Sequence, residues 1–271
     1  MILVNGKQED SIPVTDRGLQ YGDGLFETIE VKDGYCPHWQ HHIQRLARGC
    51  ALLGIVMPDI DLLLNEAILV CSNQAHAVLK IIITRGSGGR GYKIPEHSDA
   101  TRILSIHPWP EYPDMNSREG VRLHLCHTIL STQPALAGIK HLNRLDQVMA
   151  RREWDDPTIA EGLMSDAAGL VIEGTMSNLF AVRDGELFTP VISTCGVAGT
   201  MRERVIEAAA KVSITVTETT LRIDDLYTMD EMFICNSIIG IWPVRGLMSV
   251  SYASPGTITR QLQEYIAGTT E

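Results

Sequence analysis

The chain of 271 residues carries 23 Lys and Arg against 33 Asp and Glu, which gives a formal net charge of −10. Hydrophobic residues make up 44% and charged residues 21% of the chain, a balance typical of a globular protein and not of a disordered one. The acidic balance argues against binding to nucleic acid or to an anionic membrane, because phosphates require a basic surface. An anionic small molecule remains compatible only where basic residues converge.

The sequence predicts a cytoplasmic protein without a membrane segment. The apolar run at residues 1–4 is too short for a signal peptide and lacks a basic flank. No apolar stretch reaches the roughly 20 residues that a membrane helix needs. The six cysteines are scattered without a CxxC pair, as in proteins of a reducing compartment. His38, His41 and His42 indicate the solvated start of a helix, and we expect no metal site.

In the first part of the chain, the pattern predicts strands and helices around a short turn. Residues 26–31 alternate between apolar and polar, as a half-buried strand does, and Asp33-Gly34 predicts the turn after it. From Trp39 the apolar residues follow helical spacing as far as Gly54, which predicts a helix that ends at a glycine. The remaining elements predicted here are a helix and two buried strands, at about 60–70, 77–84 and 101–106.

A proline-rich stretch at residues 108–113 predicts a domain boundary. We expect a smaller N-terminal α/β domain, residues 1–110, and a larger C-terminal α/β domain, residues 114–271, that carries Lys140. Because strands alternate with helices in both, the predicted class is a two-domain mixed fold, α+β or α/β. In the second domain, residues 184–185 predict a hairpin, and residues 200–203 resemble a capping box that opens a helix. The other predicted elements are strands near 121–126, 163, 179 and 232–235, and a helix from about 144.

Residues 86–91 fit the pattern G-x-G-x-x-G but do not indicate a dinucleotide site. The residues that follow, 92–97, include Pro95 and cannot open the helix whose N-terminus would bind a pyrophosphate. Two interpretations of this segment stay open. It is either a flexible loop that carries basic residues toward an anion, namely Arg85, Arg90 and Lys93, or the solvated tip of a hairpin.

Two ionisable residues have apolar neighbours in the sequence. Lys140 lies between Ile139 and Leu142, and partial desolvation there would favour the neutral amine of Schiff-base chemistry. A lysine at the surface edge of an element shows the same pattern. Glu173 requires a cationic or N–H partner if it is buried, although on the residues alone a glutamate at a strand end that faces water is more typical.

Five motifs occur in one order along the chain. They are residues 21–28, residues 42–46, Lys140 before a helix, Glu173 with residues 178–180, and residues 199–202. Together they resemble the fold-type IV pyridoxal-phosphate (PLP) enzymes, which include branched-chain and D-amino-acid aminotransferases and 4-amino-4-deoxychorismate lyases. The resemblance covers essentially the whole chain. Within this family, residues 84–92 and 137–145 are more similar to the lyases than to the aminotransferases.

The resemblance implies roles for particular residues. Lys140 would bind PLP as an aldimine and afterwards act as acid and base. Glu173 would face the pyridine nitrogen and keep it protonated, which makes the ring a strong electron sink. Glu27 is assigned no role. The residues implied to bind the cofactor phosphate are Arg45, Thr200, Met201, Asn236 and Ser237.

The family also implies a function and an assembly. The expected reaction is conversion of 4-amino-4-deoxychorismate to 4-aminobenzoate and pyruvate, in folate biosynthesis, by aldimine formation, proton abstraction by Lys140 and elimination. The alternative is a PLP-dependent aminotransferase for D- or branched-chain amino acids, since its cofactor residues would be the same. A non-catalytic phosphate-binding protein is disfavoured, because Lys140 and Glu173 are intact. The family implies a homodimer. Cations are needed for a dianionic substrate, and the candidates are Arg85, Arg90, Lys93 and Arg144.

Overall fold

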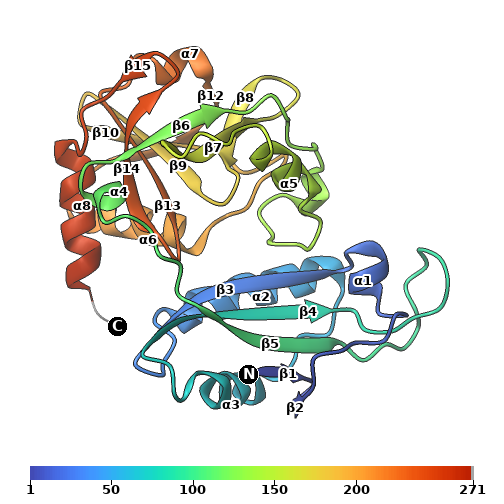
Figure 1. Ribbon diagram of the computed structural model, residues 1–271. Coiled ribbons are helices and arrows are strands. Elements are labelled where there is room, and N and C mark those ends of the chain that lie inside the picture. Colours follow the sequence, from blue (N-terminus) through green and yellow to red (C-terminus); the bar gives the residue numbers. More distant parts are fainter. Residues whose placement is uncertain (270–271) are drawn as a thin grey trace. The chain divides into compact units, whose positions relative to one another are not determined.

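The computed structural model describes residues 1–269 and divides into two compact units (Figure 1). The first unit contains residues 1–110 and 139–143, and the second contains residues 111–138 and 144–269. Both units combine strands with helices, so the predicted mixed class of fold is confirmed. The division differs in one respect from the expected domains of residues 1–110 and 114–271. The short segment with Lys140 belongs to the first unit, not to the second.

The first unit contains an antiparallel sheet of five strands in the order β2-β1-β5-β4-β3. The strands predicted near residues 26–31, 77–84 and 101–106 are present, each with one to three further residues. The hairpin of β1 and β2 was not predicted, because its strands are too short to show an alternating pattern. The bounds are β1 (Ile2–Val4), β2 (Lys7–Gln8), β3 (Gly24–Lys32), β4 (His76–Thr84) and β5 (Thr101–Pro108).

Two helices cover this sheet, as their apolar spacing predicts. Helix α2 (Trp39–Leu53) packs on β3, and α3 (Ile60–Cys71) packs on β1, β4 and β5. Helix α2 ends at Gly54 with a φ of 62°, a left-handed conformation that favours glycine. The short α1 (Arg17–Tyr21) was not predicted. The core between sheet and helices is built of fully buried aliphatic side chains, among them Leu25, Ile29, Ile43, Leu46, Leu79 and Ile81.

The segment that contains Lys140 lies along the first half of β3, the edge strand of the sheet. The Phe26 N–H donates to the Lys140 carbonyl at 3.0 Å, and the Leu142 N–H donates to the Gly24 carbonyl at 3.0 Å. Between them, Leu25 and His141 form a single β-bridge. These backbone bonds attach the segment to the first unit. The sequence pattern could not show this, because the paired residues are far apart in the chain.

The second unit contains a mixed sheet of ten strands. Nine of them follow the order β11-β10-β9-β13-β14-β6-β7-β8-β12, and β15 pairs with β14. The pairs β10–β11, β14–β6 and β6–β7 are parallel, and the others are antiparallel. The predicted strands near residues 121–126, 163, 179 and 232–235 are present. The bounds are β6 (Val121–Leu125), β7 (Ile159–Ser165), β8 (Leu170–Gly174), β9 (Asn178–Arg183), β10 (Glu186–Pro190), β11 (Val216–Thr219), β12 (Leu221–Arg222), β13 (Glu231–Asn236), β14 (Gly240–Leu247) and β15 (Val250–Ser251).

Helices α6 and α8 pack on each other and on β13. Beneath them the rings of Phe180 and Phe233 stack at a centroid distance of 5.0 Å. The helices of this unit are α4 (Met115–Arg118), α5 (Leu145–Arg151), α6 (Thr200–Lys211), α7 (Ile223–Leu226) and α8 (Thr257–Gly268), with a 3₁₀ turn at Pro134–Leu136. Within residues 1–269, every helix falls short of the length and apolarity that crossing a membrane requires.

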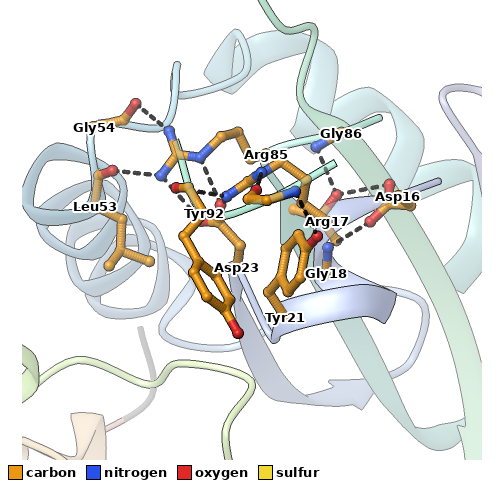
Figure 2. A network of polar contacts seen from close by, with 12 residues as sticks. Asp16, Arg17, Gly18, Tyr21, Asp23, Leu53, Gly54, Arg85, Gly86 and Tyr92 are labelled. Atoms are coloured by element: carbon orange, nitrogen blue, oxygen red, sulfur yellow. Dashed lines mark hydrogen bonds and ion pairs between the residues drawn. The ribbon is translucent and has the colours of Figure 1, made fainter. Parts of the chain in front are cut away.

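The glycine-rich segment 86–91 lies in the loop between β4 and β5, and no helix follows it, as predicted. Figure 2 shows how the loop is attached to α1. Arg17 Nη1 donates to the Gly91 carbonyl at 2.9 Å, and the Gly91 N–H donates to the Tyr21 hydroxyl at 3.1 Å. The rings of Tyr21 and Tyr92 meet edge to face at 5.4 Å. The loop is therefore tied to the first unit and not simply solvated.

Arg85 is a structural residue, which corrects the expectation that it contacts an anionic substrate. Its Nε and Nη2 donate to the Asp23 carboxylate at 2.7 and 3.0 Å (Figure 2). Nη1 and Nη2 also donate to the carbonyls of Gly54 and Leu53 at 2.8 and 2.7 Å. Arg17 Nε donates to Asp23 Oδ2 at 2.8 Å, the oxygen that also accepts from Arg85 Nε. The donors of Arg85 thus stabilise the last carbonyls of α2, where a positive charge is favoured.

Substitution of Asp23 should test this network. Burial by itself would raise the pKa of Asp23, but the hydrogen bonds and charges of Arg85 and Arg17 outweigh it and lower that pKa. We expect Asp23→Asn to cost about 2–4 kcal/mol of unfolding free energy in urea, because two largely buried guanidinium groups lose their anion. The exposed pair Asp114–Arg118, at 2.9 Å, provides the control. Asp114→Asn should cost less than about 0.5 kcal/mol, and equal losses in both variants would contradict the prediction.

Candidate active site

Lys140 lies in the first unit, over the ring of Phe26. Its Nζ is 4.4 Å from the ring centroid, and Nζ of Lys80 lies 5.4 Å from the same centroid. Lys140 is half-buried. An aromatic face stabilises an ammonium group without accepting its protons as a carboxylate does. The position therefore offers an amine close to an apolar surface.

A buried ionic cluster joins β3 to α2. Glu27 is 1% exposed and accepts two hydrogen bonds from Arg45, Nε to Oε1 at 2.8 Å and Nη2 to Oε2 at 2.5 Å. His42 Nδ1 lies 2.6 Å from the same Oε2. The prediction that this histidine belongs to a solvated helix start is wrong, because its exposed fraction is 2%. The bidentate geometry fixes the plane of the Arg45 guanidinium.

The charges within this cluster follow from burial and from its three members. Burial alone would raise the pKa of Glu27, but the charge of Arg45 and the hydrogen bonds of His42 and Arg45 hold it at about 2. The pKa of His42 lies below its ordinary value. Burial and the charges of Arg45 and Lys140 lower this pKa by more than the hydrogen bond and charge of Glu27 raise it. At neutral pH the cluster is thus a carboxylate, a guanidinium and a neutral imidazole that donates its Nδ1 proton. The influence of Lys140 on His42 places the amine near this cluster.

Sequence reasoning missed the role of Glu27, although a signal was present. Residues 25, 27, 29 and 31 share one side of β3, and Leu25, Ile29 and Val31 are buried. A carboxylate in the same register must be buried too, and it needs a cation. Histidine and arginine three positions apart in the following helix lie on one helical face and supply the partners.

In the second unit, Glu173 is buried at the end of β8, with 5% of its surface exposed. Its Oε2 accepts the Val197 N–H at 2.9 Å. The expected N–H partner is thereby found, and the alternative of a glutamate that faces water is wrong. Asn178 holds the same loop, because Nδ2 donates to the Val197 carbonyl at 2.9 Å and Oδ1 accepts the Gly199 N–H at 3.1 Å. Glu173 and the residues before α6 therefore form one framework.

Helix α6 begins at this framework, and its first residue is Thr200. The N-cap is Gly199, without a side-chain cap, so the predicted capping box with Thr200 as the cap is wrong. A Cβ on Gly199 would lie 2.1 Å from Asn178 Oδ1, so only glycine lets the Asn178 side chain lie this close to the backbone. Thr200 and Met201 are 3% and 6% exposed. Their N–H groups have no acceptor within the helix, and a helix N-terminus favours an anion.

Asn236 shapes the turn between β13 and β14. Its Oδ1 accepts the N–H groups of Ile238 and Ile239 at 2.8 and 2.9 Å, and Nδ2 donates to the Met176 carbonyl at 3.0 Å. The side chain thus organises the backbone around Ser237. Asn236 therefore positions the turn, and its direct contact with the cofactor phosphate stays a prediction.

The carboxylate of Glu161, which sequence reasoning also missed, holds the turn that follows Glu173. Glu161 is 1% exposed and accepts from Thr175 Oγ1, the Met176 N–H and Ser177 Oγ at 2.5, 3.1 and 2.8 Å. Burial raises the pKa of Glu161, and these hydrogen bonds oppose the rise. This turn includes the Met176 carbonyl, which accepts from Asn236. Glu161 therefore helps to fix the position of Asn236.

The remaining candidate cations lie in different surroundings. Arg90 and Lys93 are exposed on the loop between β4 and β5, and Arg144 is half-buried directly before α5. Contact of these three residues with a substrate stays a prediction.

The chemistry of these groups fits PLP. The first unit holds an amine on Lys140 and an oriented guanidinium on Arg45. The second holds the buried carboxylate of Glu173 and the N-terminus of α6. An amine bonds an aldehyde, a carboxylate stabilises a protonated pyridine, and guanidinium and helix N-terminus both bind phosphate dianions.

Comparison with known proteins defines the class to which this fold and these residues belong. Residues 24–247 match the family model described as amino-transferase class IV. The match extends over most of the chain and includes every candidate site residue. The chain therefore belongs to the class IV aminotransferase family.

Particular members of the family are similar over nearly their full length. The chain is 38% identical to the aminodeoxychorismate lyase of Vibrio harveyi, over 97% of this chain and 98% of that protein. It matches the crystal structure of 4-amino-4-deoxychorismate lyase from Pseudomonas aeruginosa with a TM-score of 0.94 and 44% identity, over 98% of both chains. The branched-chain amino acid aminotransferase of Escherichia coli matches with a TM-score of 0.89 and 26% identity, over 99% of this chain and 94% of that one.

Proposed function

We propose that the protein is a PLP-dependent lyase that converts 4-amino-4-deoxychorismate to 4-aminobenzoate and pyruvate, a step of folate biosynthesis. The observation that carries this proposal is the similarity to two proteins named as this lyase, at 38% and 44% identity, over at least 97% of this chain. Branched-chain aminotransferases match at lower identity, 32% for a putative one from Methanocaldococcus jannaschii and 26% for that of Escherichia coli. The lyase is therefore favoured over the aminotransferase alternative, although both share the scaffold.

The candidate residues have different tasks toward the cofactor. Lys140 Nζ is the amine that would bond the aldehyde carbon, and Glu173 would accept a hydrogen bond from the protonated pyridine nitrogen. Arg45 and the N–H groups of Thr200 and Met201 would bind the phosphate, with Ser237 as a further hydroxyl donor and Asn236 shaping its turn. The chemistry that PLP supplies when bound is an electron sink for the carbon next to the substrate nitrogen.

Lys140 is the residue that would move protons. Its neutral amine takes the proton from the ring carbon that bears the substrate amine, and the electron pair released there expels the enolpyruvyl oxygen from the adjacent carbon. The protonated amine then returns a proton to the departing group. One C–O bond breaks, the ring becomes aromatic, and the atoms of the substrate equal those of 4-aminobenzoate plus pyruvate. The reaction needs no keto-acid acceptor.

A product assay tests the proposal. Purified protein loaded with PLP receives 4-amino-4-deoxychorismate without any keto acid, and 4-aminobenzoate and pyruvate are measured together. We expect equal amounts of both over many turnovers. Absence of the aromatic product, with conversion of the cofactor to its amine form by D-alanine or leucine, would establish the aminotransferase instead.

Substitution of Glu173 should separate its electronic role from its structural one. Glutamine keeps an oxygen for the Val197 N–H, at 2.9 Å in the wild type, but removes the negative charge. We expect Glu173→Gln to lower kcat by roughly 10²- to 10³-fold, because charge stabilisation is lost where the reaction needs it. The absorbance spectrum of bound PLP should change while the unfolding midpoint stays near the wild-type value. An unchanged kcat with PLP bound would contradict this role.

Location and assembly belong to the same proposal. A cytoplasmic enzyme is consistent with the cysteines, since all six are free. We propose a homodimer, as the family resemblance implies. Light scattering during size-exclusion chromatography would give twice the mass of one chain of 29.9 kDa, and a mass of one chain would contradict it.

A further inference from the structure

Three metal-ligating side chains converge in the second unit, in residues to which the proposed reaction assigns no task. The group consists of His124 and Cys126 with Glu153, and one ligand atom from each lies within 4.8 Å of the others. Among residues 1–269 this is the one set of three or more His, Cys, Asp or Glu side chains that meets so closely. The exposed fractions of the His124 and Glu153 side chains are 22% and 16%, and Cys126 is buried.

The backbone holds these three residues in place. His124 lies in β6, which pairs with β7, and the Cys126 N–H donates to the Leu163 carbonyl at 2.9 Å. Glu153 accepts the N–H groups of His127 and Thr128 at 2.6 and 2.7 Å. The carboxylate is thus fixed to the loop that directly follows the thiol. Positions two apart at a strand end direct their side chains to the same side.

The distances within the group suit a small ion. His124 Nε2 and Glu153 Oε2 are 3.2 Å apart. A tetrahedral zinc ion with Zn–N and Zn–O distances of about 2.0 Å separates two such ligands by about 3.3 Å. An ion would replace the proton that this pair shares. A zinc-bound thiolate would lie about 3.6 Å from the other two ligand atoms. The Cys126 sulfur lies within 4.8 Å of those atoms, so it would move toward them by at most about 1 Å.

The packing around Cys126 and the negative charge beside it favour a bound cation. A Cβ on Gly162 would lie 2.5 Å from the Trp154 ring and 2.6 Å from Cys126 Sγ, so only glycine permits the thiol to sit here. The ring of His124 lies 5.4 Å from that of Trp154, which restricts its orientation. The carboxylate of Glu153 attracts a divalent cation, and a cation displaces the thiol proton when it binds.

We propose that His124, Cys126 and Glu153 form a zinc site outside the cofactor machinery, with water as the fourth ligand. Nitrogen, sulfur and oxygen donors together suit zinc better than magnesium or calcium, which prefer oxygen alone. Three protein ligands leave one position open on the ion. The role of Glu153 as an anchor of residues 127–128 is compatible with this site, because its N–H contacts use other lone pairs of the carboxylate.

Equilibrium dialysis of the full chain, loaded with PLP and freed of excess cofactor, tests the site with Zn²⁺ alone. We expect one zinc per chain, released by EDTA, and affinity at least about tenfold lower in both Cys126→Ser and His124→Gln. Cys195→Ser is the matched control, because Cys195 is a buried free thiol in the same apolar cluster. This variant should bind zinc as the wild type does. If Cys126→Ser does not fold, His124→Gln tests the same site.

Co²⁺ provides a second measurement, which reports the ligand itself. A thiolate-to-cobalt absorption band should appear in the wild type and in Cys195→Ser and be missing in Cys126→Ser, with bound PLP subtracted. Co²⁺ should also quench the fluorescence of Trp154, and Trp154→Phe should remove that part of the quenching. Zinc binding equal in the wild type and Cys126→Ser, or cobalt binding without the thiolate band, would overturn the proposal. The three residues would then serve only to anchor the loop.

Discussion

Lys140→Ala should abolish turnover of 4-amino-4-deoxychorismate. We expect kcat to fall by roughly 10⁴-fold or more, because one side chain provides both the covalent attachment and the proton transfers. The near-visible absorbance of PLP bonded to a protein amine should be lost as well. Added PLP should still bind to Lys140→Ala, since the proposed phosphate ligands do not include this residue.

Lys80 offers a matched control for this substitution. Its Nζ lies over the same Phe26 ring, at 5.4 Å against 4.4 Å for Lys140, but it comes from β4. Lys80→Ala should keep the absorbance and most of the activity. Equal losses in both variants would show that the lysines act through the packing of Phe26, and the assignment of Lys140 as the catalytic lysine would be wrong.

Glu27→Gln should destabilise the protein more than any other single change considered. Glutamine keeps one oxygen but not the negative charge. The guanidinium of Arg45 is then a buried charge without its anion, and a donor NH₂ group replaces one of the two oxygens that accept from it at 2.8 and 2.5 Å in the wild type. Removal of one partner from a buried pair costs about 3–5 kcal/mol of unfolding free energy. PLP binding should weaken too, because Glu27 orients the guanidinium proposed to bind the phosphate. Glu27→Asp should restore part of both properties.

Glu30→Gln on the same strand provides the control. Glu30 also pairs with a histidine, His76 at 3.0 Å, but the two side chains are 32% and 45% exposed. The expected cost is less than about 1 kcal/mol. Urea unfolding of both variants, followed by fluorescence, measures the difference. Similar losses in the two variants would contradict the importance of the buried cluster.

The effect of Glu27→Gln should depend on pH. The pKa of Glu27 is about 2 in the folded protein, against an ordinary value of 4.5. Its contribution to stability is therefore complete above pH 4.5 and is lost as the pH falls toward 2. The difference in unfolding free energy between wild type and Glu27→Gln should be larger at pH 7 than at pH 3. A difference that grows as the pH falls would contradict the depressed pKa.

Patterns within single elements were readable from the sequence. The alternation at residues 26–31 and the apolar spacing from Trp39 to Gly54 predict β3 and α2, because neighbouring residues alone decide which side of an element is buried. The order of five motifs along the chain likewise identified the family, which the comparisons confirm. For Glu173, apolar neighbours predicted the need for a polar partner but not which group supplies it.

Other properties are decided by contacts between residues far apart in the chain. Arg85 looked like a residue for an anionic substrate, yet Asp23 and the end of α2 engage its guanidinium. His42 looked solvated, yet it is buried and pairs with Glu27 on β3. The sequence by itself determined the elements, the family and the residue types of the chemistry, because these depend on local periodicity and motif order. Only the tertiary structure decided which charges neutralise each other, because burial brings together groups whose separation along the chain carries no such information.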